Sequence, residues 1–307
     1  GVQTCALPIS LKVVIYKFHM PLFMFASGAI SFIKIETIGR INYRSFSVDR
    51  ARRLIYPYLL FAALIIFGKS LVFAVLPTDN YNGDLFNSLK LALFFTSESP
   101  AGSLWYLVTL FQLCLSLPPL LLLHGRSLSR LMVTAGVVSV LGLAIDFPTI
   151  FGINLYCEYL LFFTFGAVYM SKRDTFITVI TVYRAYIAVG ALAAMIILYG
   201  IMNSLSPDIT KLGIGLASIP FFIAISSGLV GGWLGNVLIL LASFSMSIYL
   251  MNTIFIGLLK GCLILMFGDV SSAINYGFFP LVGAGIFGPI LLQRYFLEGT
   301  RIASLTR

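Results

Sequence analysis

Charge is scarce in this sequence. Only 10% of its 307 residues are Asp, Glu, Lys or Arg, while 59% are hydrophobic. A typical soluble domain is about 25% charged and about 45–50% apolar. So much apolar surface cannot be buried in one soluble core, which excludes a water-soluble enzyme. The apolar residues come in long unbroken runs and do not alternate singly, which excludes a β-barrel and predicts an all-α, polytopic transmembrane helix bundle.

Cysteine motifs and common catalytic signatures are also missing. The four cysteines lie far apart and form no CxxC pair, so neither a disulfide framework nor a metal site is expected. No HExxH, Walker loop, GxSxG or DxD pattern occurs. Basic residues outnumber acidic ones by 20 to 11. In a membrane protein this excess marks cytoplasmic loops, so no nucleic-acid partner is expected.

The first residues do not form a signal peptide, because they have neither a charged segment nor an adequate apolar run. We interpret residues 1–9 as a non-native leader, residues 10–300 as a single transmembrane domain and residues 301–307 as a cytoplasmic tail. On this interpretation the native N-terminal helix is missing from the sequence.

Nine segments have roughly the 20 apolar residues that a membrane-spanning helix needs. The predicted spans are residues 13–33, 54–76, 103–124, 130–147, 154–171, 178–201, 207–228, 243–267 and 274–297. A further segment, 85–96, is predicted to lie along the membrane surface. Its residues Leu85, Phe86, Leu89 and Leu93 share one helical face, as in an interfacial helix.

The loops between these spans differ in charge. Loop 34–53 carries six basic residues, and the loops that should share its side are also basic, whereas the intervening loops are mainly acidic. The positive-inside rule therefore places loop 34–53 and the C-terminus in the cytoplasm. The first visible span then runs from outside to inside. A chain that starts in the cytoplasm needs one more helix, so about nine spans are visible of an expected ten.

His19 is an ionisable residue within the first predicted span. It lies 15 residues before Lys34, about 22 Å along a helix, which places it in the outer half of the membrane. A histidine near an interface can be a simple polar cap. An ionisable group below the interface is also a functional hypothesis, and imidazole titrates near neutral pH, which suits proton abstraction from a hydroxyl group.

Arginines cluster at the start of the second predicted span. Arg50, Arg52 and Arg53 lie within the segment RARRLIYPYL. Membrane topology alone explains such a cluster. The alternative is a phosphate-binding patch, because guanidinium groups match phosphate oxygens with paired hydrogen bonds.

Four further residues are candidates for binding. Trp105 opens the third span, where an aromatic belt also explains it. Glu98 and Glu158 fall near the outer face, where either could orient a histidine or bind a sugar hydroxyl, although solvated loop carboxylates are commoner. Asn252 lies deep in the eighth span and could equally bridge two helices.

Several of these segments together resemble membrane acyltransferase family 3. FHMPLFMFASG is similar to the family's second-helix signature, and RARRLIYPYL to its arginine-rich loop. GSLWYLVTLF, YLLFFTFGAVYM and SFSMSIYLMN resemble its later elements, and all five occur in the family's order. Asn252 stands where the family often has a histidine, and the family's first-helix arginine and histidine have no counterpart in this sequence.

The resemblance implies a bacterial inner-membrane O-acyltransferase for polysaccharide modification in the cell envelope. It would use acyl-CoA, in the first instance acetyl-CoA, as donor substrate with no bound cofactor, and an extracytoplasmic glycan or lipid-linked sugar as acceptor. Arg50, Arg52 and Arg53 would hold the CoA phosphates. His19 would assist the first-helix histidine in proton transfer.

Two other functions fit a polytopic membrane protein. A transporter or flippase for an envelope lipid or sugar would typically show inverted repeats or broken helices, which the sequence does not clearly contain. A non-catalytic membrane subunit is the third possibility, which the asparagine at position 252 favours.

Overall fold

The computed structural model describes residues 9–38, 43–73, 80–201, 206–268 and 270–297. Within these ranges the chain contains no strand, which confirms the predicted all-α class. The helices are α1 Ile9–Ile38, α2 Tyr43–Phe73, α3 Leu85–Phe94, α4 Trp105–Leu123, α5 Leu128–Ala144, α6 Ile153–Ser171, α7 Arg173–Gly200, α8 Pro207–Leu229, α9 Trp233–Ser243, α10 Ser245–Phe267 and α11 Val270–Leu292, with the short helical turns η1 Gly102–Leu104, η2 Ile150–Gly152 and η3 Gln293–Leu297. Most of the predicted leader 1–9 and the whole predicted tail 301–307 lie outside the described residues.

Eight helices of the described part of the chain are long and apolar enough to cross a membrane. They correspond to eight of the nine predicted spans. The exception is the span predicted at 130–147, which forms the 17-residue helix α5. α5 ends at Ala144, where the backbone of Ile145 is extended, and Pro148 follows three residues later, so the helix does not continue.

α2 begins earlier than predicted. The sequence pattern places residues 34–53 in a loop, but the helix already starts at Tyr43. Arg50, Arg52 and Arg53 therefore lie inside a helix, which holds their backbones in a fixed orientation. The segment predicted to lie along the membrane surface forms the helix α3, and its position at the membrane surface stays a prediction. Phe86 is 80% exposed, and Ser88 is among the residues that face the protein.

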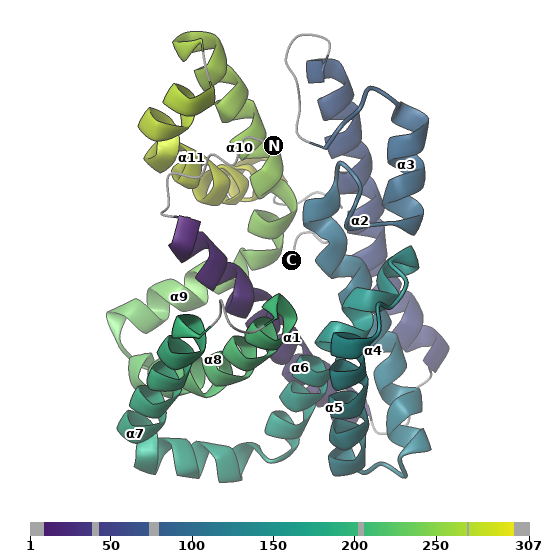
Figure 1. Ribbon diagram of the computed structural model, residues 1–307, viewed down its shortest axis with the longest axis vertical. Helices are drawn as coiled ribbons and strands as arrows, with labels where there is room; N and C mark the ends of the chain where they lie inside the picture. Colours follow the sequence, from purple (N-terminus) through teal and green to yellow (C-terminus); the bar gives the residue numbers. More distant parts are fainter. Residues whose placement is uncertain (1–8, 39–42, 74–79, 202–205, 269, 298–307) are drawn as a thin grey trace.

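The helices form two groups with α1 between them (Figure 1). α2 to α5 lie on one side, and α7 to α11 lie on the other. α1 packs mainly against α6 and also contacts α8 and α4. α6 contributes the largest fully buried side chains, Tyr159, Phe162 and Phe163, so the contact between α1 and α6 lies at the core of the bundle.

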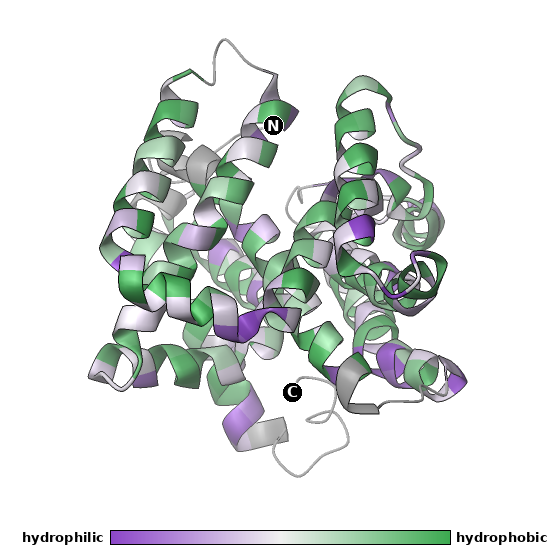
Figure 2. Ribbon diagram, turned by 90° about the horizontal axis from the view of Figure 1, so that it is seen from below, coloured by the Kyte–Doolittle hydropathy of each residue, from purple (hydrophilic) through white to green (hydrophobic). Residues whose placement is uncertain are grey.

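The outer surfaces of the helices are apolar, and hydrophobic residues cover most of each ribbon in Figure 2. α7 and α10 show this most strongly, because only 11% of each apolar stretch is buried within the protein. Exposed side chains such as Val182, Val189 and Leu258 would be costly in water. They fit a protein that crosses the bilayer several times.

Gly28 of α1 and Gly166 of α6 lie where two backbones touch. A Cβ atom on Gly28 would be 1.9 Å from the carbonyl oxygen of Phe163, and one on Gly166 would be 1.9 Å from the carbonyl oxygen of Phe25. No other residue fits without moving a helix. These glycines belong to the segments FHMPLFMFASG and YLLFFTFGAVYM, so the two motifs meet at this contact. Small residues allow such close packing between membrane helices.

Replacing Gly166 with leucine is therefore expected to separate α1 from α6. Overpacking of a tight core costs about 1–3 kcal/mol, and a backbone clash lies at the upper end or above. Most of the variant should be lost as aggregate during detergent extraction and size-exclusion chromatography. Gly190→Leu is the matched control, because a Cβ atom there meets nothing within 4 Å. Equal yields of the two variants would contradict the assigned contact.

Candidate active site

His19 lies on the α1 face near Tyr16. Its Nδ1 atom is 2.8 Å from the carbonyl oxygen of Ile15, and its ring meets the Tyr16 ring edge-on at 5.0 Å. A carbonyl oxygen can only accept a hydrogen bond, so Nδ1 carries the proton. In the neutral imidazole Nε2 is then an unprotonated acceptor. Among the described residues Nε2 has no hydrogen-bond partner.

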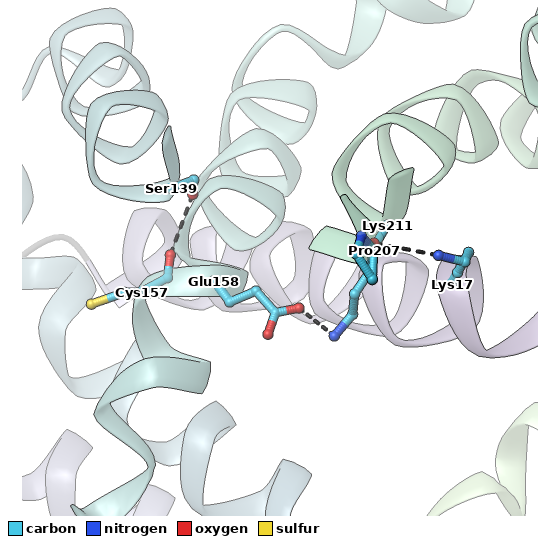
Figure 3. A network of polar contacts seen from close by, with 6 residues as sticks. All are labelled: Lys17, Ser139, Cys157, Glu158, Pro207 and Lys211. Atoms are coloured by element: carbon cyan, nitrogen blue, oxygen red, sulfur yellow. Dashed lines mark hydrogen bonds and ion pairs between the residues drawn. The ribbon is translucent and has the colours of Figure 1, made fainter. Parts of the chain in front are cut away.

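A polar network joins α1, α6 and α8 (Figure 3). Lys211 of α8 forms an ion pair with Glu158 of α6. Lys17 of α1 donates a hydrogen bond of 3.3 Å to the carbonyl oxygen of Pro207, one turn before Lys211. Lys211 lies close enough to His19 for its charge to act on the imidazole. The network therefore fixes the starts of α6 and α8 next to the histidine.

Trp105 of α4 reaches the same network through aromatic contacts. Its ring centroid lies 5.3 Å from that of Tyr159, and the Lys211 ammonium lies 5.1 Å from the Tyr159 ring centroid. This second distance is within the range of a cation–π interaction. We name the residues Lys17, His19, Trp105, Glu158, Tyr159 and Lys211 the outer cluster, after the side on which the charge pattern predicts it. The structure thus brings together three predicted site residues, His19, Trp105 and Glu158.

In the described part of the chain two predicted candidates make no direct contact with the outer cluster, although the Thr253 hydroxyl beside Asn252 lies 3.1 Å from the Ser103 hydroxyl, two residues before Trp105. Glu98 is exposed in the turn after α3, where its backbone N–H donates to the carbonyl oxygen of Phe95. Asn252 lies where α10 packs against α11, with its Cβ atom near Gly285. The Asn252 Oδ1 atom is 3.1 Å from the Thr253 hydroxyl. Among the described residues no contact joins either candidate to His19.

The arginines lie toward the other end of α1. Arg50 stacks over the Phe46 ring, with its guanidinium carbon 5.1 Å from the ring centroid. Lys34 of α1 lies close enough to Arg50 and Arg53 for their charges to interact. We name Lys34, Arg50 and Arg53 the inner cluster. The Asp49 carboxylate also acts on Lys34, but the three cations outnumber it and repel one another, so the arrangement favours a further bound anion.

Arg50 and Arg52 differ in their surroundings. Arg52 and Arg53 are exposed, whereas Arg50 is half-buried, and its Nη2 atom is inaccessible to solvent without a hydrogen-bond partner among the described residues. A buried donor of a charged group that lacks an acceptor costs free energy. A phosphate oxygen would satisfy it. The sequence pattern treats these arginines alike, but the structure singles out Arg50.

The sequence pattern does not single out three of the outer-cluster residues, Lys17, Tyr159 and Lys211. One signal for Lys17 exists, because an ionisable residue two positions before His19 in an apolar span is itself a functional hypothesis. No sequence signal pairs Glu158 with Lys211, which belong to different helices. Within the described residues no three His, Cys, Asp or Glu side chains gather as metal ligands would.

Reversing the charge of Lys211 is expected to lower the thermal stability of the protein. In Lys211→Glu two carboxylates face each other where an ion pair stood. Both side chains are about one-third exposed, so we expect a loss of about 1 kcal/mol or less. Adding Glu158→Lys should recover most of it in thermal unfolding measured in detergent. A double variant no more stable than the sum of the single changes would show that the pair contributes nothing.

The fold and these clusters define a multi-pass helical membrane protein with a cationic cluster and a histidine site along one helix. A sequence model described as an acyltransferase domain matches residues 3–293. The match covers most of the chain, so the protein belongs to membrane acyltransferase family 3 and is a membrane acyltransferase. No curated protein sequence and no solved structure matches the chain significantly.

Proposed function

We propose that the protein transfers an acyl group, in the first instance acetyl, from acyl-CoA to a hydroxyl group of an extracytoplasmic glycan or envelope molecule in a bacterial inner membrane. Family membership supports acyl transfer. One observation carries the finer proposal: α1 holds His19 with a vacant Nε2 at one end and Lys34 beside the arginines toward the other. The two residues are 15 positions apart, about 22 Å along the helix.

The inner cluster supports acyl-CoA as the donor. The CoA nucleotide carries several phosphate groups, and Arg50 offers a buried guanidinium nitrogen that lacks an acceptor. Arginine binds phosphate through paired, charge-assisted hydrogen bonds. With the nucleotide held by Arg50, Arg53 and Lys34, the extended arm of CoA would carry the thioester along the bundle toward His19.

The outer cluster supports a hydroxyl acceptor. Nε2 of His19 would take the hydroxyl proton while the oxygen attacks the thioester carbonyl carbon. The new ester bond forms, the carbon–sulfur bond breaks, and the proton passes to the departing CoA thiolate. Lys211, held by Glu158 and Tyr159, would stabilise the negative charge that develops on the carbonyl oxygen.

Purified protein in proteoliposomes tests this proposal against the transporter alternative. With acetyl-CoA and a mixture of envelope glycans, we expect release of free CoA thiol and formation of alkali-labile acetyl esters. No net movement of unmodified glycan across the bilayer is expected. Glycan movement without thioester cleavage would identify a transporter. Neither activity in the well-folded protein would favour a non-catalytic subunit.

A further inference from the structure

Around the turn η2, three buried polar atoms have no hydrogen-bond partner among the described residues. They are Thr96 Oγ1, Gln112 Oε1 and Asn154 Oδ1. Thr96 is only 2% exposed, so water outside the protein does not reach it. The three residues come from the turn after α3, from α4 and from the start of α6, and η2 contacts all three segments. None of these residues belongs to the inner or the outer cluster.

The turn η2 brings these side chains toward one place. A Cβ atom on Gly152 would lie 3.7 Å from Thr96 Oγ1 and 3.8 Å from Thr109 Oγ1. Gly152 has a φ of 70°, a left-handed conformation that favours glycine. Gln112 Nε2 donates a hydrogen bond of 2.7 Å to the carbonyl oxygen of Phe151. Two hydroxyl groups and one side-chain amide therefore lie around the turn, beside Gly152, which has no side chain to fill the space between them.

The three unpaired atoms differ in the hydrogen bonds that they can form. The bond to the Phe151 carbonyl fixes the orientation of the Gln112 amide, so its vacant Oε1 atom is an acceptor. Asn154 Oδ1 is a second vacant acceptor, and the Thr96 hydroxyl can donate or accept. Two acceptors and a hydroxyl match a ligand that is rich in hydrogen-bond donors. Sugar hydroxyl groups supply donors and acceptors together.

Aromatic rings lie beside these polar atoms. The ring centroids of Phe94 and Phe151 are 5.4 Å apart, and the two side chains are 38% and 46% exposed. Exposed rings next to amides and hydroxyls suit a sugar, which has an apolar face as well as hydroxyl groups. A phosphate or carboxylate would fit poorly, because the two vacant amide oxygens would repel an anion.

We propose that Thr96, Thr109, Gln112 and Asn154 bind hydroxyl groups of the acceptor glycan. The proposal rests on the proposed acyltransferase function and assigns its acceptor subsite. On α4, Trp105, Thr109 and Gln112 are spaced by four and three residues and so share one face. This face connects the subsite with the outer cluster, because Trp105 contacts Tyr159. A sugar held at η2 would thus extend toward His19.

The unfolding temperature of Thr96→Val shows whether the Thr96 hydroxyl is free to bind a ligand or instead stabilises the fold. The Thr96 hydroxyl has no partner, so its removal should leave the unfolding temperature unchanged or raise it by up to about 3 °C. Thr164→Val is the matched control. Thr164 is 1% exposed, but its hydroxyl donates within α6 to Leu160 O at 2.9 Å. A clear loss of stability in Thr96→Val alone would mean that the hydroxyl holds an internal water, and would overturn the proposal.

The functional test uses the full chain in cells. Thr96→Val and Thr96→Val/Asn154→Leu are expressed at the abundance of the wild type, and alkali-released acetate is measured in the envelope fraction. We expect this acetate to fall at least about tenfold, which corresponds to ~1.4 kcal/mol of acceptor binding. Cleavage of acetyl-CoA by isolated membranes should fall in parallel, because the bound acceptor hydroxyl attacks the thioester, whereas the KM for acetyl-CoA should stay at the wild-type value.

Two results distinguish a failure of the acceptor subsite from a failure of the proposed acyltransferase function. Unchanged envelope acetate in both variants, with normal acetyl-CoA cleavage, would overturn the acceptor subsite and leave the proposed function standing. If wild-type membranes cleave no acetyl-CoA, the proposed function fails, and the acceptor role fails with it. Thr164→Val should behave as the wild type in every assay.

Discussion

Replacing His19 with alanine is expected to lower acyl transfer by about 10²–10⁴-fold, the usual contribution of a general acid–base group. Nδ1 is held by the carbonyl oxygen of Ile15, so the neutral ring presents Nε2 as a proton acceptor. Alanine removes that acceptor without filling space. The rate should be measured with acetyl-CoA and envelope glycan at equal membrane abundance of the two proteins.

His124→Ala is the natural control for this experiment. His124 is the second of the two histidines, and both of its ring nitrogens are occupied. They lie 2.8 Å from the Leu120 carbonyl oxygen and 2.8 Å from the Thr134 hydroxyl. This side chain caps the end of α4, so its loss should affect stability and leave transfer nearly unchanged. Wild-type turnover in His19→Ala would reduce His19 to a structural cap.

Replacing Arg50 with glutamine is expected to raise the apparent KM for acyl-CoA by about 10–100-fold. A hydrogen bond to a charged group is worth about 1.5–3 kcal/mol, and each 1.4 kcal/mol is a factor of ten. Arg50 is singled out because its Nη2 atom is buried and has no acceptor among the described residues. Arg50→Lys keeps the charge but loses the planar fork, so it should show a smaller increase.

Arg52→Gln is the matched control, two positions away on the same helix and exposed. It should change the KM for acyl-CoA far less than Arg50→Gln. The maximal rate at saturating acyl-CoA should stay near the wild-type value in both variants, because the thioester still reaches His19. Equal effects of the two changes would show that the arginines act only through overall charge or topology.

The positions of the helices could largely be predicted from apolar runs, and the differences have local causes. α5 ends after 17 residues because Ile145 is extended and Pro148 follows. α2 starts before its apolar run, since hydropathy cannot detect a polar first turn that packs on α4. There the Tyr43 hydroxyl donates to the Leu115 carbonyl oxygen at 3.1 Å. On α3, tertiary packing buries Ser88 and leaves Phe86 exposed.

The candidate site could be predicted only in part. Residue type and position within the predicted spans indicate a role for His19, Trp105 and Glu158. The structure brings these three residues together in one cluster. Their connection through Lys211 depends on how α6 and α8 pack, which no local pattern encodes. The polar atoms around η2 likewise become apparent only when three separate segments meet. Asn252 and Glu98 make no direct contact with His19 among the described residues, so a role for either stays a prediction.

The most direct test follows the acyl group from one side of the membrane to the other. Acetyl-CoA labelled in its acetyl group is enclosed in vesicles with the cytoplasmic face inside, and the protein in their membrane is supplied with envelope glycan outside. We predict that the label appears on the external glycan as an alkali-labile ester while CoA remains inside, and that His19→Ala abolishes this transfer. Label that stays on CoA, or glycan that crosses the bilayer unmodified, would contradict the assignment as an acyltransferase of extracytoplasmic hydroxyl groups.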